Sequence, residues 1–311
     1  MVIMTSKLEK TIAELLCCPY CLSYMYPPIN QCLNGHNICH ECYFRVLQCP
    51  TCRESKSLVA RNYTLEAIFS ILNLPCKYND LGCDYICVGE KIKSHEDYCW
   101  YKKKKCPFAT YDTCPWIDSM FNLRNHLLKC HSPSFVESRK NHFTSTNFKG
   151  ISSYHYIFAV IYVYGKFFRL TWELEKSSKM TAWAVYFMGS SEEASNYSYK
   201  LEIISGAETK KENRHLMFKT VCDPKPENEV NDIIKFGDHN CFYIHKSLLD
   251  KYCKANGDLQ YLVTIYKNIA KGPESSSTKS ESGLVQSEEV IDVTDDSQEI
   301  SSIVKVEADK S

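Results

Sequence analysis

The sequence lacks three features that mark common classes of protein. No charge of one sign is in excess, because 37 basic residues balance 37 acidic ones, and a neutral chain favours neither nucleic acid nor a membrane surface as its partner. The longest apolar run, "YIFAVIYVYG" at 156–165, is about half of what a bilayer crossing needs. The N-terminus "MVIMTSKLEKTIAELLCC" has no cationic head, apolar run and cleavage site of a secretory signal. We therefore expect an intracellular, reducing location.

Cysteine, in contrast, is abundant and unevenly distributed. The chain has 18 cysteines, of which fifteen precede residue 131 and three follow it. In a reducing compartment, clustered thiols are more often metal ligands or catalysts than disulfides. The distribution predicts a metal-rich front half and a conventional globular back half.

The first cluster has the ligands for two zinc ions. Its seven thiols and one imidazole are Cys18, Cys21, Cys32, His36, Cys39, Cys42, Cys49 and Cys52. Two-residue gaps let both thiolates of a knuckle reach one ion. This stretch has too few apolar side chains for a core, so each structural zinc must supply folding energy of about 10–16 kcal/mol. Spacing alone leaves open whether the two sites are sequential or interleaved.

The second cluster repeats one design twice and predicts tandem zinc fingers. Its ligands are Cys76, Cys83, His95 and Cys99, followed by Cys106, Cys114, His126 and His131. Cys130 competes with His131 as the last ligand. DNA-reading fingers have a shorter first gap and base-reading side chains at set helix positions, which disfavours nucleic-acid recognition. Between the clusters, the apolar spacing at 61–73 predicts a helix with Thr64 as its cap.

The sequence pattern "CPYC…YPPINQCLNGHNICHEC…CPTCR" resembles the RING finger of the seven-in-absentia (Sina/Siah) family of ubiquitin ligases. The resemblance implies cross-braced sites, with one zinc on Cys18, Cys21, Cys39 and Cys42 and the other on Cys32, His36, Cys49 and Cys52. The finger intervals also match this family, and His131 is preferred over Cys130 because the family pattern ends on histidine.

All RING ligands are committed, so no coordination position remains open for catalysis, and we expect four structural zinc ions and no catalytic residue. The resemblance implies that the surface docks a conjugating enzyme carrying ubiquitin. Leu22 and Pro50 map to the docking face. Arg53 matches the basic position that bridges ubiquitin and conjugating enzyme, for which its planar donors are suited.

From about residue 154 the chain has aromatic and β-branched runs at strand period, with one short helix expected at 246–253. This pattern predicts a sandwich of two antiparallel sheets. "YGKFFRL" and "NGDLQYLVTI" resemble the family's TRAF-like domain, which dimerises and adds a substrate peptide along a sheet edge. The matching edge is 153–163, where Tyr156 and Ile157 replace an Asp-Trp pair of the animal proteins.

The tail, from 269 to 311, is rich in Ser, Glu and Asp, and its composition predicts disorder. Within it, Val290, Ile291 and Val293 lie among acidic residues and match a SUMO-interacting motif. "VKVE" at 304–307 has the form of a SUMO acceptor site, with Lys305 as the modified lysine. Short motifs of this kind often arise by chance, so an unused tail is the simpler alternative.

These observations predict a multi-domain, RING-type ubiquitin ligase that recruits protein substrates for degradation, with a zinc-dependent adaptor without activity as the alternative. The expected parts are an N-terminal segment 1–16, a RING finger 17–57, a double zinc finger 58–132, a TRAF-like domain 133–268 and a disordered tail 269–311. Expected partners are a conjugating enzyme, ubiquitin, substrate peptides, a second copy of the chain and SUMO. The expected location is cytoplasm and nucleus.

Overall fold

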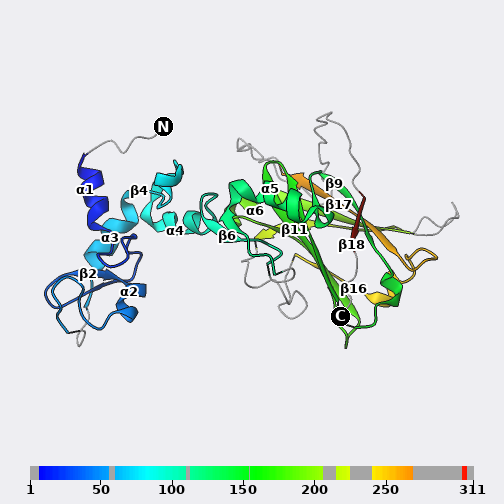
Figure 1. Ribbon diagram of the computed structural model, residues 1–311, viewed down its shortest axis with the longest axis horizontal. Coiled ribbons are helices and arrows are strands. Elements are labelled where there is room, and N and C mark those ends of the chain that lie inside the picture. The colour runs from blue at the N-terminus through cyan, green and yellow to red at the C-terminus, as the bar shows by residue number, and fades with distance from the viewer. Residues whose placement is uncertain are drawn as a thin grey trace, which may run out of the picture. The chain divides into compact units, whose positions relative to one another are not determined.

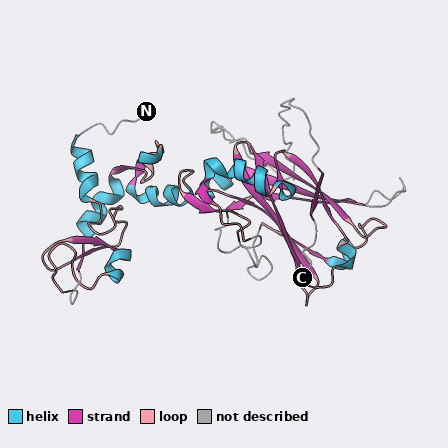
Figure 2. Ribbon diagram, viewed as in Figure 1, coloured by secondary structure: helices cyan, strands magenta, loops and turns pink. Residues whose placement is uncertain are grey.

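The structure is a computed structural model that describes residues 7–55, 60–109, 113–153, 155–205, 215–224, 240–268 and 303–306. It has two compact units, residues 1–124 and 125–311. Short helices and strands build the first unit, whereas long strands dominate the second (Figure 2). Among the described residues, no helix has both the length and the apolar character needed to span a bilayer.

The first unit begins with a small three-stranded module whose sheet has the order β2-β1-β3. Its elements are α1 (Lys7–Leu15), β1 (Ile29–Gln31), β2 (Asn37–Cys39), α2 (His40–Arg45) and β3 (Ala60–Arg61). Helix α1 was not expected from the sequence. Few apolar side chains are buried in this module, chiefly Met25, Ile29 and Ile38, together with the thiols of Cys18, Cys39 and Cys42. Such a core is too small to fold without metal.

Two ββα modules follow helix α3, which was expected at 61–73. The elements are α3 (Tyr63–Ile71), β4 (Asn73–Pro75), η1 (Asn79–Leu81), β5 (Ile86–Val88), α4 (Gly89–Tyr98), β6 (Lys103–Lys105), β7 (Ile117–Ser119) and α5 (Met120–Cys130). The expected cap was wrong: the side chain of Asn62, rather than Thr64, accepts a hydrogen bond from the backbone N–H of Leu65 at 3.0 Å. Asn is among the strongest N-cap residues, because its short side chain reaches the free N–H groups of the first turn.

The second unit is a β-sandwich, and the predicted fold class is confirmed. One sheet contains β8 (Phe135–Val136), β10 (His155–Val163), β11 (Lys166–Leu174), β12 (Met180–Phe187), β15 (Asp223–Pro224) and β16 (Phe242–His245). The other has the order β14-β13-β17-β9-β18, formed by β14 (His215–Val221), β13 (Tyr197–Ile204), β17 (Leu259–Lys267), β9 (Lys140–Ser145) and β18 (Ile303–Val306). The short strands β8, β15 and β18 pair in parallel, which departs from the purely antiparallel expectation.

Short helical segments join these strands. They are η2 (Ser132–Ser134), η3 (Phe148–Gly150), α6 (Ser191–Ala194) and α8 (Lys246–Leu249). The last is shorter than the helix expected at 246–253, because the backbone N–H groups of Lys251 and Tyr252 donate to carbonyls only three residues back, at 3.1 and 2.8 Å, which forms turns in place of a further α-helical turn.

Aromatic side chains fill the space between the two sheets. On β11, Phe168, Leu170 and Trp172 belong to the buried core, while the alternating residues face the other way, as the pleat of a strand requires. Trp172 stacks on Trp183 of β12 with ring centroids 5.1 Å apart, and Trp183 meets the edge of Tyr261 from the opposite sheet at 4.9 Å. Burial of these large rings supplies most of the stabilisation of the sandwich.

Candidate metal centres and docking surface

The structure gathers the sixteen predicted metal ligands into four groups, and the ligand atoms within each group lie within 4.8 Å of one another. The groups are Cys18, Cys21, Cys39 and Cys42; Cys32, His36, Cys49 and Cys52; Cys76, Cys83, His95 and Cys99; and Cys106, Cys114, His126 and His131. Four thiol or imidazole donors per group fit tetrahedral zinc. The first two groups interleave along the chain, so the two sites of the RING are cross-braced.

The two knuckles of the RING are built alike. The backbone N–H of Leu22 donates to the carbonyl of Cys18 at 2.8 Å, and that of Arg53 donates to Cys49 at 2.9 Å. Leu22 and Arg53 are the residues directly after the second cysteine of each knuckle, and both have a left-handed backbone, with φ of 61° and 60°. Non-glycine residues adopt this conformation only where the surrounding structure imposes it. We attribute it here to the closed turn that places two cysteines on one ion.

Backbone N–H groups point at the sulfurs, which favours the thiolate that a metal requires. The Cys39 Sγ accepts from the N–H of Cys42 at 3.4 Å at the start of α2. In the fingers, the N–H of Tyr78 donates to Cys76 Sγ at 3.5 Å, and that of Phe108 donates to Cys106 Sγ at 3.4 Å. A hydrogen bond to the charged form stabilises it and prepares the site for a cation.

The Cys18 thiol shows the balance of these effects. Burial opposes its charged form, but backbone N–H groups of Cys39, Cys21 and Tyr20 outweigh burial and lower its pKa to about 7. Burial is also the first influence on Cys49, where N–H groups of Cys52 and Thr51 again bring the pKa below its usual value. The pKa of Cys52 is also below its usual value, chiefly through a hydrogen bond from the Asn34 side chain. Each RING site therefore has at least one thiol that ionises easily and can begin metal capture.

The cysteines outside the groups occupy different surroundings. Cys17 is half-buried and its Sγ donates to the carbonyl of Ala13 at 3.5 Å, and burial raises its pKa. Cys87 is half-buried on β5. Cys130 is exposed, and the fourth group contains His131 in its place.

The expected docking residues lie on the exposed surface of the RING. Leu22 is 79% exposed, as are several other large apolar side chains of the chain, among them Leu47 at 90%. Pro50 and Arg53 are also exposed. Pro50 lines a shallow pocket together with Ile38, Tyr43 and Val46. The turns closed by the metal ligands thus present an apolar and a basic side chain at equivalent positions of the two knuckles.

A buried carboxylate joins the RING to α3. Glu66 on α3 accepts from the backbone N–H of Ile29 in β1 at 2.8 Å. It also receives two hydrogen bonds from the Arg61 guanidinium, both at 2.7 Å. The Arg61 hydrogen bonds hold the pKa of Glu66 below its usual value. This bidentate pair fixes the direction in which α3 leaves the RING.

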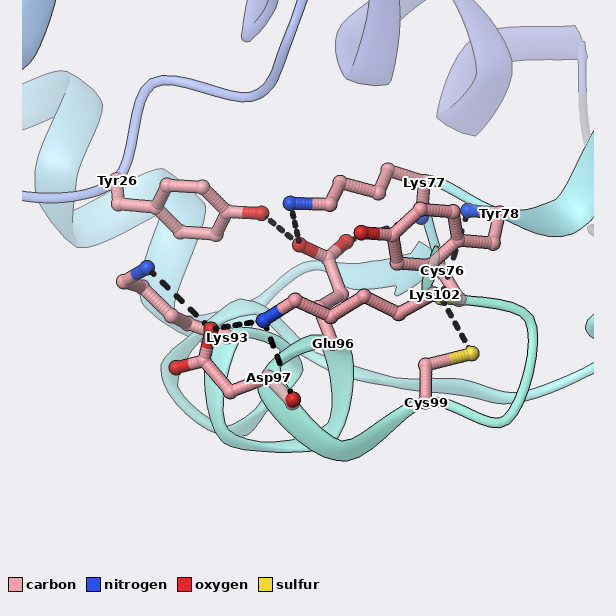
Figure 3. A network of polar contacts seen from close by, with 9 residues as sticks. All are labelled: Tyr26, Cys76, Lys77, Tyr78, Lys93, Glu96, Asp97, Cys99 and Lys102. Atoms are coloured by element: carbon pink, nitrogen blue, oxygen red, sulfur yellow. Dashed lines mark hydrogen bonds and ion pairs between the residues drawn. The ribbon is translucent and has the colours of Figure 1, made fainter. Parts of the chain in front are cut away.

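A second buried carboxylate joins the RING to the first finger (Figure 3). Glu96 on α4 is 1% exposed and accepts from the backbone N–H of Lys77 at 2.9 Å, with the Lys77 Nζ at 3.5 Å. Its other donor is the hydroxyl of Tyr26, which belongs to the RING. Burial, followed by this hydrogen bond, raises the pKa of Tyr26, so the hydroxyl keeps its proton and donates at neutral pH.

Apolar packing completes the joint between the RING and the first finger. One buried cluster contains Leu16 from the RING side, Phe69 from α3 and Ile92 from α4, with Tyr26 packed against it. Gly89 begins α4 so close to α3 that a Cβ there would lie 2.0 Å from the carbonyl oxygen of Phe69. The RING and the first finger therefore share one core. Glu66, Glu96 and Tyr26 could not be predicted from the sequence, because nothing in their local pattern distinguishes them from surface residues.

The expected substrate-binding edge is strand β10. Tyr156 is half-buried, and its hydroxyl accepts from the Arg169 guanidinium at 2.7 Å. Ile157 is 7% exposed and faces the core. Strand β8 pairs with β10 only at Val160 and Ile161, so the first half of β10 has no second strand beside it among the described residues. The role of Tyr156 and Ile157 in substrate binding stays a prediction.

The tail motifs are only partly within the described structure. Val290, Ile291 and Val293 lie outside the described residues. Lys305 lies in β18, paired in register with Thr144 of β9.

Comparison with known proteins adds an independent finding. Three family models match successive parts of the chain: "E3 ubiquitin-protein ligase sina/sinah, RING finger" matches residues 18–52, "Sina, zinc finger" matches 67–144, and "Sina, TRAF-like domain" matches 161–264. The chain is 36% identical over 204 residues to "E3 ubiquitin-protein ligase DIS1" of Oryza sativa subsp. japonica, covering 63% of this chain and 66% of the relative.

Two further relatives are similar over a comparable length. Identity is 34% to "E3 ubiquitin-protein ligase SINAT4" of Arabidopsis thaliana and 30% to "E3 ubiquitin-protein ligase SIAH2" of Homo sapiens, in each case over 198 residues, 62% of this chain and 60% of the relative. The matched region thus spans a little under two thirds of the length of these relatives.

The metal groups lead to a prediction about zinc content. The purified full chain should carry four zinc ions, one for each group. Cys18→Ser should lower the content to about three, because a tetrahedral structural site does not tolerate loss of a thiolate. Cys17→Ser, at the neighbouring position, should leave the content unchanged. Elemental analysis after gel filtration measures both. Loss of an ion from Cys17→Ser would contradict the assignment.

The joint between the RING and the first finger leads to a second prediction. Glu96→Ala removes the acceptor for Tyr26 and for the Lys77 backbone, so it should cost about 1–3 kcal/mol through unsatisfied buried donors. Thermal unfolding of the zinc-loaded chain measures this loss. Glu90→Ala, an exposed carboxylate in the first turn of the same helix, is the matched control and should have little effect. Equal melting temperatures for the two variants would disprove the role of Glu96.

Proposed function

The chain belongs to the Sina/Siah family, and we propose that it acts as a RING-type E3 ubiquitin ligase. The RING binds a conjugating enzyme that carries ubiquitin as a thioester. The TRAF-like sandwich recruits protein substrates as extended peptides, and ubiquitination directs them to proteasomal degradation. No covalent ubiquitin intermediate forms on this chain.

The observation that carries this proposal is the equivalent placement of Leu22 and Arg53 on the two knuckles of the RING. Both follow a metal-binding turn with the same hydrogen bonding and the same left-handed backbone. Their side chains are exposed, which a purely structural role does not require. An apolar residue suits the docking of a protein partner, and a guanidinium suits the simultaneous binding of two carbonyl groups.

The chemistry of such a ligase is positional. Zinc, when bound, supplies the folding energy that makes the knuckles rigid. Leu22 and Pro50 would bind the conjugating enzyme. Arg53 would restrain the attached ubiquitin so that the thioester is aligned for an incoming lysine, which is a proximity effect. Acid–base catalysis by this chain is not required.

The alternative is an adaptor that tethers partners without activity. An adaptor would also need its zinc sites and its sandwich, but it has no need for Leu22, Pro50 and Arg53 on the RING surface together. Incubation of the purified chain with ubiquitin, activating enzyme and a panel of conjugating enzymes distinguishes the two. A ligase forms ubiquitin ladders that disappear on chelation, whereas an adaptor forms none.

Three further parts of the proposal come from the resemblance and from the tail. We propose that the chain forms a homodimer through the sandwich, which sedimentation velocity tests. The segment containing Val290, Ile291 and Val293 is proposed to bind SUMO, and titration of a peptide of residues 284–300 into labelled SUMO should shift its NMR signals. A location in cytoplasm and nucleus is tested by imaging a tagged chain; confinement to a membrane compartment would refute it.

Arg53 gives the sharpest test of the mechanism. Arg53→Ala should slow single-turnover discharge of ubiquitin from the conjugating enzyme on the order of tenfold or more, because the thioester loses its alignment. Zinc content and binding of the conjugating enzyme should stay nearly unchanged. Arg45→Ala, at the exposed end of α2, is the control and should discharge at the natural rate. Unchanged discharge by Arg53→Ala would remove this residue from the mechanism.

A further inference from the structure

Strand β9 would be the edge of its sheet without the segment Ile303–Val306. On its inner side β9 pairs with β17 along Lys140–Ser145. Asn141, Phe143 and Ser145 alternate along the strand and are at most 1% exposed, because they share the face on which Phe143 packs into the core of the sandwich. An edge strand presents unpaired N–H and C=O groups that readily pair with another chain, so proteins cover or block such edges.

The segment that covers this edge comes from the far end of the chain. Strand β18 pairs with β9 in parallel, with Ile303 opposite His142 and Val306 opposite Ser145 (Figure 1). The other strands of the sandwich are complete at Lys267, the last residue of β17. Residues 268–302 separate β17 from β18. A parallel neighbour cannot be reached by a tight hairpin. Strand β18 is therefore attached to the sandwich as a tethered peptide would be.

The composition of the segment explains why this part of the tail pairs. From residue 272 onward the tail has ten acidic and three basic residues, a composition that does not fold by itself. Within it, Ile303, Val304 and Val306 are β-branched, and such residues favour an extended strand. The segment is short, so few backbone hydrogen bonds hold it, and its pairing is reversible. Its covalent attachment to the same chain compensates, because a linked segment binds at an effective concentration that can reach the millimolar range.

We propose that the edge of β9 binds peptides and that the chain's own segment Ile303–Val306 is its resident ligand. This segment competes for the edge with extended segments of other proteins. The inference rests on the proposed function in one respect: the competitors that matter are substrate segments delivered to the ligase. Their chemistry should resemble that of the resident, with β-branched residues in an extended stretch. A substrate segment then binds the edge of β9 only if its affinity is high enough to displace the tethered segment.

A second element lies at the same place. The 3₁₀ turn η2 lies against β18, and η2 starts at the residue after the metal ligand His131. The binding edge is thus bounded by a segment that the last zinc ligand holds in position.

The test uses the full chain and a fluorescent peptide of residues 300–308 as the probe. In the chain variant Val304→Pro with Val306→Pro, the resident segment loses backbone donors and cannot pair as a strand. The matched control carries the same two prolines just outside the strand, as Glu299→Pro with Ser301→Pro. Fluorescence anisotropy should show the probe binding the first variant at least about tenfold more tightly than the natural chain, because the tethered competitor is gone. The control should behave as the natural chain does.

Hydrogen exchange locates the binding edge. Amides of Lys140–Ser145 should exchange faster in the Val304→Pro, Val306→Pro variant, and addition of the probe should restore their protection. Amides of β13, in the interior of the same sheet, should not change. Equal probe affinity for all three chains, or no binding to the first variant, would overturn the proposal. So would unchanged exchange at β9.

A ubiquitin-discharge assay on the same three chains separates this proposal from the proposed function. Discharge to free lysine depends on the RING and should be equal in all three. Absence of discharge from every chain, with the expected probe binding, refutes the ligase function and leaves the resident strand intact. Normal discharge with equal probe affinities refutes the resident strand and leaves the ligase function intact.

Discussion

Coordination of metal by thiolate and imidazole is the constraint on which the front half of this protein depends. The RING buries only a few apolar side chains besides its ligands, far fewer than a module of this size needs to fold alone. The two ligand groups of the RING replace that missing core. They also create the two tight turns that force Leu22 and Arg53 into a left-handed backbone. The same ligand geometry thus provides both stability and the surface that a partner would contact.

Buried polar contacts fix how the RING packs against the helices that follow it. Glu66 and Glu96 lie on consecutive helices, and each accepts hydrogen bonds from the RING. A buried carboxylate is costly unless its hydrogen bonds are satisfied, and removal of a partner costs more than the pair contributes. These two residues therefore specify one arrangement of the RING and the first finger, and the apolar cluster around Phe69 stabilises it.

The sequence was most informative where chemistry restricts the residue type. Cysteine and histidine at regular intervals predicted the zinc cofactors, and alternation of aromatic and β-branched residues predicted the sandwich. The pairing of the RING sites came from the family resemblance, since spacing is compatible with either arrangement. Glu66, Glu96 and Tyr26 could not be found, because their roles depend on partners far away in the chain. Strand β18 was missed for a related reason: four residues in an acidic tail show β-propensity but do not indicate which edge they join.

The close approach of α3 and α4 at Gly89 has a consequence for the proposed ligase function. Because the RING and the first finger share one buried core, a carrier bound to the RING as proposed would not swivel independently of that finger. A change in the orientation of the bound carrier would then have to come from segments further along the chain. Under the proposed function, the choice of acceptor lysine would therefore depend on this shared RING–finger core, and lengthening or softening it should broaden the range of lysines that are modified.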